Sequence, residues 1–225
     1  MHSQIYFARP ETLNDPFDCQ VDVHKAHENA VKQLSGSNKR ILESLFDTDF
    51  QKFLNERLHE LKNFGIFSAS HKASLTNPLL WSHYANEHKG ICLVYSIPVN
   101  LCSPGNGVIG MINVKYGENT LTEWFLDLPQ NTKIHAKAFE EMMKMILTIK
   151  SSYWQYEDEV RIIRSSAGNL LIDQSYLQHI CFGLNTSEED KTLIRKIATK
   201  FGYDVGYSEI RRTQDDFGIT AVDIK

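Results

Sequence analysis

Strand-like and helix-like segments alternate irregularly along this chain, and the strand-like segments are short. Only the helix-like segment that follows HICFGLN (residues 179–185) lies between two strand-like segments in a strand–helix–strand order. A doubly wound parallel sheet needs that order throughout, because parallel strands are joined by crossover helices. The order therefore predicts an α+β fold, with a short-stranded mixed or antiparallel sheet and helices packed around it.

The length of 225 residues fits a single domain over residues 1–225. Apolar residues recur at helical spacing between about residues 38 and 64, which predicts a helical insertion there. The other predicted elements are strands at 4–8, 65–70, 91–97, 108–117, 154–163 and 179–185, helices at 79–89, 132–150 and 186–201, and a final hairpin after residue 202.

Composition and charge exclude several classes of protein. The formal net charge is −4, so there is no general basic field to attract nucleic acid. The longest nearly apolar run, ICLVYSIPV, is about half of what a bilayer requires, and MHSQIYFARP lacks a secretory segment. The four cysteines are scattered, with no CxxC. We therefore expect a soluble cytoplasmic protein with no membrane partner and no disulfide framework; its acceptor and its oligomeric state stay open.

The first motif that could carry chemistry is NDPFD, residues 14–18. Its residue types favour a turn, with Phe17 packed into the core. The alternative is a pocket-lining loop in which Asn14 or Asp15 holds a ligand hydroxyl or amide. A group of acidic and histidine residues follows, at a spacing too loose to assign any metal ligand. This group is the basis of a metal-dependent hydrolase as the third hypothesis; its members are Asp18, Asp22, His24 and His27.

The second motif is NPLLWSHYANEHKG, where Asn77 is expected to cap a helix that ends at Gly90. Trp81 and Tyr84 fall on one helix face, which is most often a core-facing stripe. Both side chains carry a polar group, however, and an aromatic face beside a pocket could stack a flat ring. His83 is a further binding candidate, although it lies on another side of the helix from Tyr84.

The third motif is WQYEDEVRII, residues 154–163. On a strand, Glu157, Glu159 and Arg161 share one face, and Val160 and Ile162 share the other. Spacing alone favours the solvated face of an edge strand. In the alternative, the two glutamates lie roughly 6.5–7 Å apart along the strand and divide the work of a catalytic site. Arg161 would then tune them by pairing with Glu159.

Three segments in this order, YFARPETLNDPFDC, NPLLWSHYANEHKGICLVY and WQYEDEVRI, resemble a bacterial family catalogued as domain of unknown function 2971. The resemblance covers nearly the whole chain, but the family name implies no activity. The family layout is in turn similar to ADP-ribosyltransferase-like proteins. That similarity implies an ADP-ribosyltransferase-like fold. It implies that NAD is a substrate and not a tightly bound cofactor, and that the nicotinamide ring stacks on Tyr84. It also implies that Glu159 or Glu157 stabilises the oxocarbenium-like ribosyl centre.

At its N-terminus, this chain departs from the family pattern. Relatives begin with an extra strand carrying a Tyr-Lys-Tyr-Arg or Tyr-His-Tyr-Thr type signature, which supplies the first NAD-binding residue. Here Met1 lies just before the YFARP strand, and His2 is a poor substitute. Either the chain is shortened, or another residue substitutes, or the protein does no NAD chemistry. Besides the hydrolase, the sequence thus leaves two hypotheses: an NAD-using ADP-ribosyltransferase-like or NAD-hydrolysing enzyme in defence or toxin biology, and a non-catalytic ligand-sensing or partner-binding domain.

Overall fold

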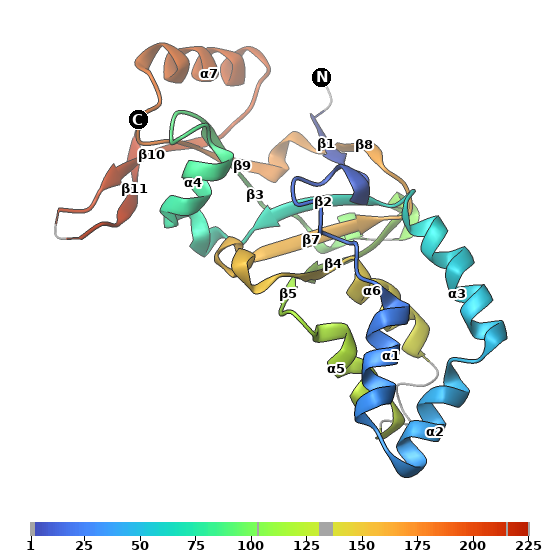
Figure 1. The fold of residues 1–225 in the computed structure, drawn as a ribbon. Helices are drawn as coiled ribbons and strands as arrows, with labels where there is room; N and C mark the ends of the chain where they lie inside the picture. The colour runs from blue at the N-terminus through green and yellow to red at the C-terminus, as the bar shows by residue number, and fades with distance from the viewer. Residues whose placement is uncertain (1–2, 103, 131–136, 215, 225) are drawn as a thin grey trace.

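The computed structural model of the protein describes residues 3–102, 104–130, 137–214 and 216–224 (Figure 1). It has the predicted α+β fold, in which helices accompany several small antiparallel and mixed sheets. Within the described ranges, no helix is long and apolar enough to cross a membrane. The helices are α1 (Val23–Gln33), α2 (Gly36–Leu45), α3 (Thr48–Leu61), α4 (Pro78–Tyr84), α5 (Thr120–Asp127), α6 (Ala138–Ile146) and α7 (Glu188–Lys200).

The strands form two principal sheets and two short ladders. One sheet has the order β2-β7-β4 and is antiparallel, and the other has the order β11-β10-β9-β3. The short ladders pair β1 with β8 and β5 with β6. The strands are β1 (Ser3–Phe7), β2 (Gly65–Ser70), β3 (Ile91–Tyr95), β4 (Val108–Asn113), β5 (Lys115–Tyr116), β6 (Ile149–Lys150), β7 (Glu159–Arg164), β8 (Gly168–Ile172), β9 (Leu177–Phe182), β10 (Gly206–Arg212) and β11 (Ile219–Ile224).

The strand–helix–strand unit predicted after HICFGLN is present. Strands β9 and β10 are parallel and α7 joins them, whereas β10 and β11 form the predicted antiparallel hairpin. The cap of α7 is Ser187, whose side chain accepts a hydrogen bond from the backbone of Asp190. The helix ends before Gly202, whose φ of 72° suits a residue without a side chain.

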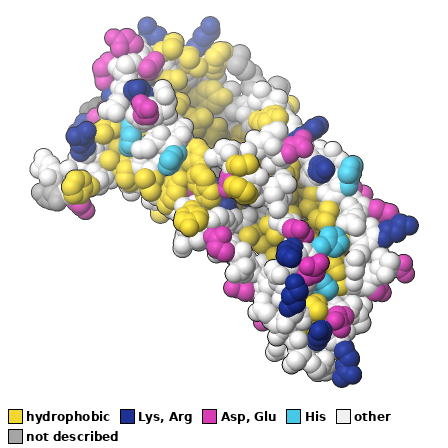
Figure 2. All heavy atoms as spheres, in the orientation of Figure 1, with side chains coloured by type: hydrophobic (Ala, Val, Ile, Leu, Met, Phe, Trp, Pro, Cys, Tyr) yellow, Lys and Arg dark blue, Asp and Glu magenta, His cyan; other side chains and the backbone are white. Residues whose placement is uncertain are grey.

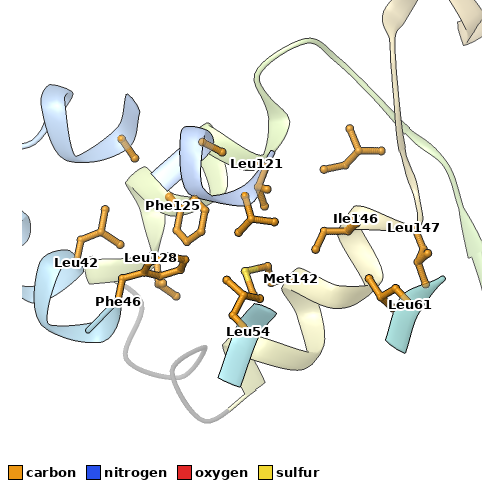
Figure 3. Close-up of a cluster of buried hydrophobic side chains, with 14 of the residues drawn as sticks. Leu42, Phe46, Leu54, Leu61, Leu121, Phe125, Leu128, Met142, Ile146 and Leu147 are labelled. Carbon is orange, nitrogen blue, oxygen red and sulfur yellow. The ribbon is translucent and has the colours of Figure 1, made fainter. Parts of the chain in front are cut away.

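Five helices surround one large apolar cluster, which Figure 3 shows in close-up. Helices α2 and α3 occupy the predicted helical region, and Asp47 separates them by capping α3 through a hydrogen bond from the backbone of Phe50. The cluster reaches the sheet through Ile66 of β2 and Ile163 of β7. The helices therefore form a layer beneath the sheet β2-β7-β4, as the lower half of Figure 1 shows.

Two predicted helices end earlier than their patterns indicated. Helix α4 stops at Tyr84 and not at residue 89, because Asn86, Glu87 and His88 all have positive φ, a left-handed conformation that cannot continue a helix. The helix predicted over 132–150 is α6, which ends at Ile146, and Ile149–Lys150 form β6, which pairs with β5 in a short ladder. Its predicted start, including residues 132–136, lies outside the described residues.

The prediction of one strand over 154–163 is also wrong in its first half. Residues Ser152–Glu157 form a 3-10 helix, and Asp158 turns the chain with a φ of 45°. Strand β7 begins only at Glu159 and lies in the centre of its sheet, between β2 and β4. The charged face is therefore not the solvated face of an edge strand.

Candidate functional site

The charged face of β7 points toward the helical layer, and there it is buried. Arg161 is fully buried and Glu159 is only 5% exposed. Glu157 comes from the turn before the strand and is 4% exposed. Burying three charged groups is costly unless each one is paired. The surrounding elements supply the partners.

Arg161 is the centre of this ionic cluster. Its guanidinium donates to both carboxylate oxygens of Asp18 at 2.9 and 2.6 Å, and its Nε donates to Glu159 Oε1 at 2.7 Å. It also donates to the carbonyl of Leu147 at 2.8 Å. The rigid fork of an arginine suits such bidentate pairing. Arg161 thus ties β7 to the NDPFD loop and to the end of α6.

Lys150, from β6, is the second cation of the cluster and is 5% exposed. Its Nζ lies 2.5 Å from Glu157, 3.1 Å from Glu159 and 3.6 Å from Asp18. The other oxygen of Glu157 accepts a hydrogen bond from the hydroxyl of Tyr84, at the end of α4. Three carboxylates against one lysine and one arginine leave the cluster with a formal charge of −1.

The pKa shifts follow from this pairing. Burial opposes the charged forms of Glu159 and Lys150, but their partners outweigh it: Arg161 lowers the pKa of Glu159, and Glu157 together with Glu159 raises the pKa of Lys150. Burial and the hydrogen bond to Glu157 raise the pKa of the Tyr84 hydroxyl. The two glutamate-bound groups, lysine and tyrosine, therefore keep their protons at neutral pH.

A cavity of about 1040 Å³ opens beside this cluster. Glu157, Glu159 and Asp18 line its polar end, together with Lys150 and Tyr84. Apolar side chains of β1, β2, β3 and β7 line the remainder, including Phe67, Leu93, Tyr95 and Ile162. In Figure 2, hydrophobic side chains gather around a hollow in the upper half of the molecule. The volume is that of a site for a drug-sized or nucleotide-sized molecule.

The structure brings five of the eight predicted site residues to this cavity: Glu157, Glu159, Trp81, Tyr84 and Asn14. Asn14 donates to the Tyr84 hydroxyl at 3.2 Å, so the NDPFD loop and the WSHYA helix meet there. Trp81 is 3% exposed, and its Nε1 donates to the carbonyl of Leu75 at 2.7 Å. It is thus both a core residue, as helical spacing favours, and part of the cavity wall.

The other three predicted site residues lie away from the cavity surface. Arg161 lies behind Glu159, where it supports the cluster. Asp15 is buried and accepts a hydrogen bond from the backbone of Phe17, which stabilises the loop. His83 is exposed, with its ring 6.0 Å from that of Tyr156. Phe17, expected in the core, is 82% exposed, because Asp15 holds the turn with this side chain outward.

The four residues behind the metal hypothesis have separate partners. Asp22 caps α1, His24 bonds to Asn55 at 2.9 Å, and His27 stacks on Phe46 with ring centroids 4.0 Å apart. Asp18 pairs with Arg161. Across the part of the chain that the structure describes, no group of three histidine, cysteine or acidic residues is arranged to hold a metal ion. The loose spacing in the sequence thus corresponds to four different structural roles.

Sequence reasoning missed the partners of the glutamates. The sequence predicts Lys150 as the last residue of a long helix and Tyr116 as part of a continuous strand. In the structure, the hydroxyl of Tyr116 accepts a hydrogen bond from the backbone N–H of Glu159 at 2.9 Å. The sequence marks Asp18 only as a candidate metal ligand. No spacing signal could have found these contacts, because Asp18 and Arg161 are joined by tertiary packing across 143 residues of sequence.

The lowered pKa of Glu159 predicts a loss of stability in acid. A carboxylate with a lower pKa in the folded state contributes stability above its unfolded pKa, about 4.3 for glutamate, and loses it as the pH falls through the folded value. We expect the free energy of unfolding, measured with urea, to decrease steadily as the pH falls below about 4.3. Glu159→Gln should flatten this dependence, and Glu189→Gln, on the exposed start of α7, is the matched control.

These features define the class of the protein: an α+β domain with a buried acidic and basic cluster at one end of a large, partly aromatic cavity. Residues 80–162 match the model of a family described as protein of unknown function (DUF2971). This segment contains Trp81, Tyr84, Lys150 and both cavity glutamates, but not the NDPFD loop. No curated protein and no solved structure matches the chain.

Proposed function

We propose that the protein binds NAD in this cavity and cleaves its N-glycosidic bond, transferring ADP-ribose to an acceptor or to water. One observation supports this above the others: Glu157 is a buried carboxylate that lines a cavity of about 1040 Å³, with its two oxygens held by Tyr84 and Lys150. A carboxylate fixed in this way is oriented before the substrate arrives.

The chemistry requires stabilisation of positive charge. When the bond between C1′ and the nicotinamide nitrogen breaks, nicotinamide leaves with the bonding electron pair and C1′ becomes cationic. A cluster with a formal charge of −1 favours such a centre. The acceptor or water then adds at C1′ and gives up its proton to Glu157 or to solvent. We assign Glu157 the catalytic role, and Glu159, bound by Arg161 and Lys150, a positioning role.

The remaining predicted residues take binding roles in this proposal. Tyr84 is 52% exposed and stacks the nicotinamide, and Asn14 orients Tyr84 through their hydrogen bond. Trp81 forms the wall behind it. Lys72 also lines the cavity and is the candidate partner for the pyrophosphate. Consumption of NAD in the cytoplasm is the basis on which we extend the proposal to defence or toxin biology.

We expect the purified protein to release nicotinamide from NAD and to be thermally stabilised by NAD. Glu157→Gln keeps the size of the side chain but removes its charge, so it should lower kcat by roughly 10²–10³-fold, the cost typical of losing one preorganised electrostatic contact. Glu189→Gln is the matched control, because Glu189 is exposed on α7. Nicotinamide release is measured by chromatography, with stability checked by urea unfolding.

A second function is favoured by the fact that each carboxylate of the cluster contacts a buried cation, Lys150 or Arg161. Glu159 and Asp18 are both neutralised by Arg161 and Lys150, an arrangement that also suits a rigid, non-catalytic ligand-sensing domain. The same experiment separates the two functions. Thermal stabilisation by NAD without nicotinamide release supports the sensing domain. If NAD is neither converted nor able to stabilise the protein, the proposal of NAD binding fails.

A further inference from the structure

Two cysteines lie opposite each other on adjacent strands of the sheet β11-β10-β9-β3. Cys92 of β3 and Cys181 of β9 are register partners in an antiparallel pair. Directly opposite residues of such a pair project to the same face of the sheet. Both side chains accordingly belong to one apolar cluster, together with Trp81. Their thiols are free.

The backbone geometry of this pair suits a covalent bond. Gly90 lies two residues before Cys92, and its carbonyl accepts a hydrogen bond from the backbone of Gly183 at 3.0 Å. Hydrogen-bonded and non-hydrogen-bonded pairs alternate along an antiparallel ladder, so Cys92 and Cys181 form a hydrogen-bonded pair. The Cα atoms of such a pair lie about 5.5 Å apart. A disulfide spans Cα separations of about 4.4–6.8 Å. The Cα separation therefore suits a disulfide, whereas the Cβ atoms of a hydrogen-bonded pair, about 5.5 Å apart, must approach by about 1 Å, which strains the bond and makes it easier to reduce.

The two thiols differ in accessibility. Cys92 is partly exposed and lines the large cavity, whereas Cys181 is fully buried. A small reagent in the cavity can therefore reach Cys92 but not Cys181. This difference gives the pair an order of reaction, in which Cys92 reacts first and Cys181 resolves the product.

We propose that Cys92 and Cys181 form a reversible cross-strand disulfide in the cavity wall, by exchange with a low-molecular-weight disulfide. The Cys92 thiolate attacks one sulfur of the reagent, forms a mixed disulfide and releases the first thiol. The Cys181 sulfur then attacks Sγ of Cys92 and releases the second thiol. Each cysteine loses one proton, the pair is oxidised by two electrons, and the reagent is reduced to two thiols.

The environment of Cys92 sets the rate of this exchange. Burial and, to a smaller extent, the neighbouring Cys181 raise the pKa of its thiol to about 11. Because the thiolate is the nucleophile, the first step is slow at neutral pH and should accelerate about tenfold per pH unit below pH 11. The pair would respond to sustained oxidation and not to brief exposure. The disulfide also lies where a cavity ligand would contact it.

The test uses the full chain, reduced and then incubated with oxidised glutathione at pH 7, 8 and 9. We expect the intact mass to fall by about 2 Da, the loss of two hydrogen atoms. A peptide map without reductant should link Cys92 to Cys181, and dithiothreitol should reverse the link. Cys181→Ser should retain glutathione on Cys92, and Cys92→Ser should leave Cys181 unmodified in the folded protein.

Three results would overturn the proposal. The first is a glutathione adduct that persists on Cys92 in the wild-type protein, because Cys181 would then be unable to resolve it. The second is a disulfide that joins Cys19 or Cys102 in place of this pair. The third is no modification at pH 9 after prolonged incubation. The wild-type map decides the matter even if a serine variant folds poorly, and none of these results depends on NAD turnover.

Discussion

Arg161→Met should destabilise the protein by about 3–5 kcal/mol, the usual cost of removing one partner from a buried ion pair. Arg161 is fully buried and holds Asp18 and Glu159 by four hydrogen bonds to their carboxylates. Without it, Lys150 is the remaining cation of the cluster, facing three carboxylates. Urea unfolding at neutral pH measures the change.

The matched control for this variant is Arg211→Met. Arg211 also pairs with a glutamate, Glu209, but its side chain is 57% exposed. Exposed pairs contribute at most about 1 kcal/mol, so this variant should remain close to the wild type. Arg161→Lys should be intermediate between the wild type and Arg161→Met, because a lysine keeps the charge but cannot reproduce the bidentate fork. Equal stability of Arg161→Met and Arg211→Met would mean that the cluster is hydrated in solution.

Trp81→Ala should cost about 3–5 kcal/mol, as large-to-small changes of buried aromatic residues do. Trp81 is 3% exposed and packs against Ala85, Cys181 and Ile210, so its removal leaves a void between α4 and the four-stranded sheet. Urea unfolding again measures this loss. The void would adjoin the cavity, and NAD binding should weaken together with stability if the cavity is the binding site.

Trp81→Phe separates packing from hydrogen bonding. The smaller ring keeps most of the apolar contact but leaves the carbonyl of Leu75 without its donor, which should cost about 1–3 kcal/mol. The control is Tyr153→Ala, since Tyr153 is 84% exposed and surface substitutions usually change stability by about 0.5 kcal/mol or less. If Trp81→Ala is as stable as this control, Trp81 contributes to the cavity wall and not to the core.

Much of the architecture could be predicted because it depends on local chemistry. Asn77 caps its helix as expected, and the final hairpin and the α7 crossover follow the patterns in the sequence. The predicted helix and strand boundaries are wrong where tertiary contacts override the local conformational preference of the residues. The three left-handed residues after α4 and the turn at Asp158 are stabilised by contacts with distant segments, such as the hydrogen bond from His71 to the Asp158 carbonyl at 3.1 Å.

The amino-acid sequence by itself determined the class of fold, because the order and length of its apolar patterns allow few ways to bury them. It also marked three motifs whose side chains meet at one cavity. Only the tertiary structure decided that the charged face of β7 is buried. Periodicity tells which residues share a face, but not what covers that face. Here Asp18 pairs with Arg161, and Lys150 pairs with Glu159 and lies near Asp18. Both partners come from distant segments, and their opposite charges offset the cost of burying the charged face.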